Sequence, residues 1–114
     1  MGARSRPPCI MCLQETHGTI VRNAEMEAAR VAEKRGNRSH NTMMMYRKRH
    51  KALMSEHGTD VREWKPNDLR KLADVRFARG EMRRNTETLR RDARAHRMRA
   101  TWHGNIAAFW GRVG

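Results

Sequence analysis

The sequence is poor in the side chains from which a globular core is built. Of its 114 residues, 38% are apolar and only 5% are aromatic. A domain of this length needs a larger apolar share to bury a substantial core. The composition therefore excludes a large self-contained core, and we expect at most one small domain with a modest interior.

Long hydrophobic runs are missing as well. No stretch approaches the roughly 20 apolar residues of a membrane span. The charged start MGARSRPPCIMC lacks the apolar region of a secretory signal. We therefore expect a protein that has no membrane partner and is not secreted, and that is located in the cytoplasm or within a nucleoprotein particle.

The residue groups that carry catalysis are also absent from the sequence. It contains no paired carboxylates in an apolar setting, no glycine-rich phosphate loop, and no Ser or Cys nucleophile with a suitably spaced base. No segment alternates apolar and polar residues in the manner of a strand. We therefore expect an all-α protein that is not an enzyme.

Acidic residues are scarce relative to basic ones. The chain has 25 Lys and Arg against 12 Asp and Glu, a net charge of +13, and 20 of the 25 bases are arginine. The two halves of the sequence carry similar excesses, so the charge is not confined to a tail. Guanidinium presents a planar fork of donors that suits phosphate, which favours a polyanionic partner.

The most basic segment, residues 81–103, contains no Pro or Gly and consists largely of good helix formers. Its arginines surround a thin inward stripe: Met82, Thr86, Leu89, Ala93, His96 and Ala100. We expect a long Arg-rich helix here that ends at Gly104.

The preceding segments predict shorter helices. Residues 19–35 form an amphipathic helix with Ile20, Ala24 and Ala28 on one side and Gly36 at its end. A second helix over residues 43–57 ends at Gly58. Its inward stripe contains Met43, Tyr46, His50, Leu53, Met54 and His57. A third helix begins near Asn67 and bends or breaks at Gly80, with Trp64 as an anchor before it.

The predicted fold is thus all-α and extended, with three to four helices. It has four parts: an extended arm with a partial zinc site (1–18), a small helical core (19–80), the Arg-rich helix (81–103) and a docking segment (104–114). In the last part, Phe109 and Trp110 are large apolar groups on a basic background. They favour docking, together with Trp102, onto a partner protein or onto the chain's own first helices.

Thirteen basic residues are candidates for nucleic-acid binding. Six lie in a segment from Lys34 to Lys51 that contains no acidic residue, and a solvated charged face is the simpler alternative for such a run. The full set comprises Arg35, Arg38, Arg47, Lys48, Arg49, Lys51, Arg83, Arg84, Arg90, Arg91, Arg94, Arg97 and Arg99.

A zinc site is a further candidate. Cys9, Cys12 and His17 have the spacing of the first three ligands of a zinc knuckle. Arg22 occupies the place of the fourth ligand, so another histidine would have to complete the site. The alternative is that these are two small apolar thiols and a loop histidine without metal.

Three functions remain open on the sequence. The leading hypothesis is a small structural subunit of a large nucleoprotein assembly, either ribosome-like or inside a virion, that binds RNA or DNA mainly through phosphate contacts. The second is a zinc-containing DNA-binding regulator. The third is a helical interaction protein whose arginine face binds an acidic partner protein.

Overall fold

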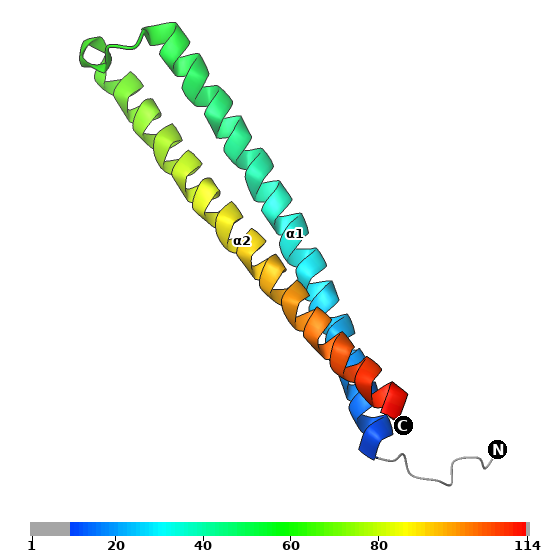
Figure 1. Ribbon diagram of the computed structural model, residues 1–114. Helices are drawn as coiled ribbons and strands as arrows, with labels where there is room; N and C mark the ends of the chain where they lie inside the picture. The colour runs from blue at the N-terminus through cyan, green and yellow to red at the C-terminus, as the bar shows by residue number, and fades with distance from the viewer. Residues whose placement is uncertain (1–9, 114) are drawn as a thin grey trace, which may run out of the picture. The chain divides into compact units, whose positions relative to one another are not determined.

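The structure is a computed structural model that describes residues 10–113, and the side chains of residues 13–112. Nearly all of these residues lie in two α-helices of 48 residues each, α1 (Ile10–His57) and α2 (Pro66–Val113). The connection between them contains one 3-10 turn, η2 (Val61–Glu63) (Figure 1). The all-α prediction is confirmed, but the expected three to four helices are two.

The sequence predicted helix ends at several glycines where the structure has none. Gly36, Gly80 and Gly104 all lie inside helices, and residues 10–18 belong to α1 and do not form an extended arm. A glycine inside a helix costs only about 1 kcal/mol relative to alanine. Packing against a neighbouring helix can outweigh that cost. The prediction at Gly58 is correct: α1 ends beside it, and its φ of +86° is one that side chains with a Cβ rarely adopt.

The chain divides into two compact units, which we describe separately. Unit 1 combines the start of α1, up to Val31, with the end of α2, from Asp92. Unit 2 comprises Ala32–Arg91 and includes the connection. Within each unit the α1 and α2 segments are antiparallel. Residues later in α1 contact residues earlier in α2.

The core of unit 1 is made of small residues. Ala29, Ala93, Ala100 and Ala107 are buried, and Gly18 lies directly against Ala107. Small side chains allow two helix backbones to approach closely, so the contact area comes from backbone and methyl groups instead of large side chains. Ile20 and Ala24 were predicted to face inward, but both are exposed.

The core of unit 2 combines small and larger residues. Ala32, Ser39, Leu72 and Thr86 are buried. The Ser39 and Thr86 hydroxyl oxygens lie 3.0 Å apart, and both are within 3.0 Å of the Met82 carbonyl oxygen. These hydrogen bonds satisfy the polar groups that the two helices bury.

The inward stripes predicted from Met43 to His57 and from Met82 to Ala100 are confirmed. On α1 of unit 2, the stripe from Met43 to His57 is half-buried at every predicted position. On α2, Thr86 is buried and Met82 and Leu89 are half-buried in unit 2. In unit 1, Ala93 and Ala100 are buried and His96 is half-buried. The 3.6-residue period therefore identifies these faces even where the apolar stripe is thin.

Trp64 anchors the connection, as the sequence predicted. It is buried to 6% exposure, and its indole Nε1 donates a hydrogen bond of 3.1 Å to the Gly58 carbonyl oxygen. Its ring lies 5.0 Å from that of His57, whose Nε2 is 3.6 Å from Asp68 on α2. The end of α1, the connection and the start of α2 are thereby held together in unit 2.

Candidate nucleic-acid interface

The positive charge is concentrated in unit 2. Residues 32–91 contain 17 Lys and Arg against 8 Asp and Glu, which is 9 of the 13 excess charges of the whole chain. Division of the sequence into two halves had shown an even distribution. The net charge differs between the units, although it is similar in the two halves of the sequence. Unit 2 comprises the middle of the chain, where most of the basic residues lie.

All thirteen residues predicted to bind nucleic acid have exposed side chains. Each lies outside the inward stripes, so the packing of the helices leaves every one of these cations facing solvent. Ten of them belong to unit 2: Arg35, Arg38, Arg47, Lys48, Arg49, Lys51, Arg83, Arg84, Arg90 and Arg91. Arg94, Arg97 and Arg99 belong to unit 1.

A few of these arginines have acidic neighbours. Arg84 pairs with Glu81 one turn earlier on α2 in unit 2. In unit 1, the Arg99 guanidinium lies 3.3 Å from a Glu25 carboxylate oxygen. Exposed pairs of this kind contribute little stability and can exchange one anionic partner for another.

A groove in unit 2 places basic and polar side chains from both helices together. Arg35, Arg38 and Thr42 line it from α1, and Asn85 lines it from α2. It has a volume of about 410 Å³, and its floor includes Ser39, Met82 and Leu89. Guanidinium, hydroxyl and amide groups are the side chains that most often donate hydrogen bonds to phosphate oxygens.

In unit 2, Arg79 of α2 and His50 of α1 form a polar layer between the helices. The sequence pattern did not predict this contact. Arg79 Nη1 lies 3.1 Å from His50 Nδ1. Partial burial, together with the charges of Arg76 and Arg79, lowers the pKa of His50 below its ordinary value. His50 is therefore the neutral acceptor of an arginine donor, and the layer carries only positive charge from its arginines.

Unit 1 contains a cluster of one acidic and two basic side chains, Glu25, His96 and Arg99. His96 Nδ1 lies 2.5 Å from one carboxylate oxygen of Glu25, and Arg99 Nη2 lies 2.9 Å from the same His96 nitrogen. The hydrogen bond from His96, opposed by desolvation and assisted by Arg99, lowers the pKa of Glu25. The sequence pattern does not indicate this pairing, because Glu25 and His96 are 71 positions apart in the chain.

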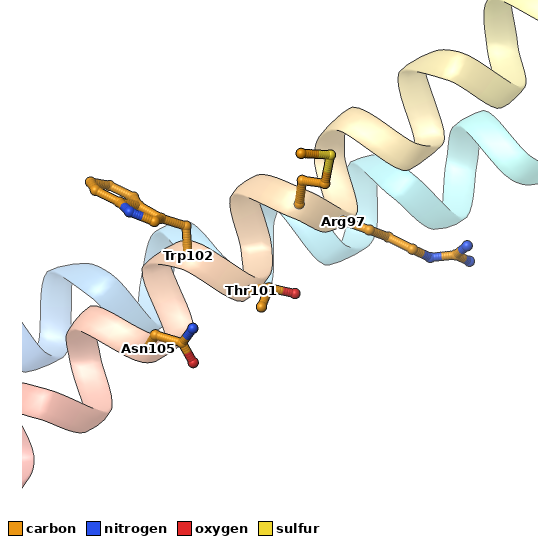
Figure 2. A pocket seen from close by; sticks show the side chains of 5 residues that line it. Arg97, Thr101, Trp102 and Asn105 are labelled. Carbon is orange, nitrogen blue, oxygen red and sulfur yellow. The ribbon is translucent and has the colours of Figure 1, made fainter.

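The residues predicted to dock a partner are only partly accessible. Trp102 and Phe109 are 61% and 50% exposed, while Trp110 is half-buried and its ring lies 5.3 Å from that of Phe109. Trp102 lines a shallow groove on α2 together with Arg97, Met98, Thr101 and Asn105. The Trp102 indole and the Arg97 side chain extend in opposite directions from α2 (Figure 2).

The zinc prediction falls largely outside the described side chains. Cys9 lies outside the described residues, and the side chain of Cys12 is not among those described, whereas His17 is exposed on α1. Over the residues that the structure describes, no three His, Cys, Asp or Glu side chains are grouped so that they could hold a metal ion. Zinc binding through Cys9 and Cys12 therefore stays a prediction.

Within the described residues, neither helix is long and apolar enough to cross a membrane. Comparison with known proteins yields no relatives: no protein-family model matches the chain, and no curated protein or solved structure matches it significantly.

Proposed function

We propose that the protein is a small basic structural subunit of a nucleoprotein assembly and binds RNA or DNA through phosphate contacts. The observation that supports this most directly is that ten of the predicted cations, all exposed, belong to unit 2, which has an excess of nine positive charges. A polyanion relieves the repulsion among these charges, and release of its counterions drives binding. The proposal contains no catalytic step.

Three arginines on α2 of unit 2 provide the test. Arg83, Arg90 and Arg91 are exposed and lie off the inward stripe. The triple variant R83Q/R90Q/R91Q removes three charges while retaining good helix formers. For a double-stranded probe, each lost phosphate contact should reduce the slope of log affinity against log salt by about 0.9.

The matched control is R83K/R90K/R91K, which keeps the charges. We expect the glutamine variant to bind an RNA or DNA duplex more weakly with a shallower salt slope, and the lysine variant to retain most of the slope. Equal affinity and slope in all three proteins, with helicity unchanged by circular dichroism, would contradict the proposal for this surface.

The zinc-containing regulator is a separate candidate that depends on Cys9 and Cys12 and on no described contact. Metal analysis of the purified chain decides it: about one equivalent of zinc supports the site, and metal-free protein excludes it.

A further inference from the structure

The groove lined by Arg35, Arg38, Thr42 and Asn85 lies entirely within unit 2. Arg35, Arg38 and Thr42 follow one another along α1 at spacings of three and four residues, so they lie on one side of that helix. Asn85 lines the groove from α2. Among the described residues, neither guanidinium group forms a hydrogen bond or an ion pair. Both are therefore free to bind an anion in the groove.

Acidic side chains near the groove do not neutralise these two arginines. On α1, the nearest acid in the sequence is Glu33, which lies about 140–160° around the helix from both of them. On α2, Glu87 lies about 160° around the helix from Asn85. Glu81 is on the groove side of α2 and pairs with Arg84.

The Thr42 hydroxyl can only accept a hydrogen bond from a ligand. Its Oγ1 donates its proton to the Arg38 carbonyl oxygen, one turn earlier on α1, at 3.0 Å. A hydroxyl has one proton and two lone pairs, so the oxygen is left as an acceptor. On the floor of the groove, the Ser39 hydroxyl likewise donates to the Met82 carbonyl oxygen, at 3.0 Å. The groove therefore combines donors for an anion with an acceptor for a hydroxyl group.

A ribonucleotide carries both of the groups that this groove would bind. Its phosphate accepts hydrogen bonds from guanidinium, and its 2′-hydroxyl, on the same sugar as a backbone phosphate, can donate one. DNA has the phosphate but lacks this hydroxyl. The ionised carboxylates of an acidic partner protein are acceptors only and have no proton for Thr42, which disfavours that occupant.

The 2′-hydroxyls of an RNA duplex lie in a wide, shallow minor groove, where a protein surface reaches them without opening base pairs. Resting on the proposed function, we propose that this groove of unit 2 is a ribose-phosphate site that selects RNA over DNA. Arg35 and Arg38 bind a backbone phosphate, and Thr42 accepts a hydrogen bond from a 2′-hydroxyl. The other cations of unit 2 bind phosphate alone and do not distinguish the two nucleic acids.

The test uses the full-length chain and three duplexes of one sequence: RNA, DNA, and RNA with 2′-O-methyl groups, which keeps the A-form but lacks the hydroxyl proton. We expect the wild type to bind RNA about 2- to 12-fold more tightly than the other two, the range that corresponds to one net hydrogen bond. Thr42→Val, which has a similar shape but no acceptor, should lose this preference. Thr42→Ser, which keeps the hydroxyl, should retain it.

Thr19 provides the matched control. It is half-buried like Thr42, and its Oγ1 donates the same kind of hydrogen bond, to the Glu15 carbonyl oxygen at 3.0 Å, but it belongs to unit 1 and does not line the groove. Thr19→Val should bind RNA with the wild-type preference. Equal loss of the preference in both valine variants would overturn the site.

The two arginines are tested by the double variant R35Q/R38Q. It should bind all three duplexes more weakly and with a shallower salt slope, whereas R35K/R38K, which keeps the charges, should retain most of the slope. Wild-type affinity and slope in R35Q/R38Q would show that no phosphate is bound here and would overturn the site.

One comparison separates this site from the proposed function. If the wild type binds RNA, DNA and methylated RNA equally and with a steep salt slope, the site is wrong and the proposed function stands. If it binds none of the three duplexes at low salt, the proposed function itself is wrong.

Discussion

At the scale of single residues, two glycines inside helices lie in opposite surroundings. A Cβ added at Gly18 would lie 3.0 Å from Ala107 Cβ and 3.1 Å from the His103 carbonyl oxygen, neither of which can move without the helix. At Gly80, an added Cβ would meet only the flexible end of Arg84, at 3.7 Å. Only the first position therefore requires glycine for close approach.

This difference predicts opposite effects of the same substitution. Gly18→Ala should lower the free energy of unfolding, because the helices of unit 1 must separate to admit the methyl group. Gly80→Ala should raise it by up to about 1 kcal/mol through better helix propensity. Urea unfolding followed by circular dichroism measures both, and shifts in the same direction would refute the packing described for Gly18.

His50 makes unit 2 sensitive to acid. Its folded-state pKa is lowered from the ordinary value of 6.5, first by burial and then by Arg76 and Arg79. The unfolded chain therefore binds a proton that the folded chain resists. The stability contributed by neutral His50 is fully present above about pH 6.5 and is lost as the pH falls through the lowered pKa.

The corresponding variant is His50→Gln, which retains an acceptor for Arg79 and does not titrate. We expect the wild type to lose more stability than this variant between pH 7 and pH 5, as measured by thermal unfolding at each pH. Parallel pH profiles of the two proteins would show that His50 does not contribute to the acid sensitivity.

At the scale of elements, the turn between α1 and α2 depends on Trp64. Its ring fills the space between His57 and the connection, and its indole nitrogen bonds to Gly58. Trp64→Ala should cost about 3–5 kcal/mol, the usual range for removal of a buried large aromatic residue. Trp64→Phe loses the hydrogen bond but keeps most of the packing.

The two Trp64 variants should therefore differ clearly. Trp64→Phe is expected to lower the free energy of unfolding by about 1 kcal/mol, the contribution of a typical hydrogen bond, and to remain folded at room temperature. Thermal unfolding by circular dichroism compares them. A Trp64→Ala protein as stable as the wild type would mean that the connection does not depend on this side chain.

The elements also show how far the sequence predicts this fold. Helical type, the stop at Gly58 and the inward stripes from Met43 and Met82 onward follow from local propensity and period, and the structure confirms them. The helix interior at Gly36 could not be predicted from propensity, because contact with Leu89 and Arg90 of α2 offsets the cost of glycine there. At Gly80 the described residues make no such contact, and α2 continues through it because one interior glycine costs only about 1 kcal/mol. The prediction that Ile20 faces inward was wrong, because hydrophobicity alone favours its burial, whereas small Gly18 and charged Glu25 lie at the helix contact.

For the candidate site, the composition predicted the exposed cations. It did not predict the contacts between side chains of α1 and α2. The thirteen basic residues were identified because they are numerous and unbalanced by acids. The contacts of His50 with Arg79 and of Glu25 with His96 join residues 29 and 71 positions apart, and no local pattern encodes such pairs. The regular spacing of 3 and 4 residues along both stripes was the one signal that could have suggested them.

At the scale of the whole molecule, composition and structure agree on a small interior. Among the described residues, no large side chain is completely buried, and the fully enclosed positions are mostly alanine. A chain with 13 excess positive charges and this limited core is destabilised by its own repulsion, which an anionic partner would relieve.

Our central proposal is that the exposed cations bind the phosphate groups of nucleic acid, and not a particular protein partner or a metal. The most direct test is the affinity of the purified wild-type chain for an RNA or DNA duplex, measured by fluorescence anisotropy over a series of salt concentrations. We expect tight binding at low salt and a log–log slope of several units, about 0.9 for each phosphate contacted. A stably folded chain that ignores nucleic acid at low ionic strength, or binds it with no dependence on salt, would contradict the account.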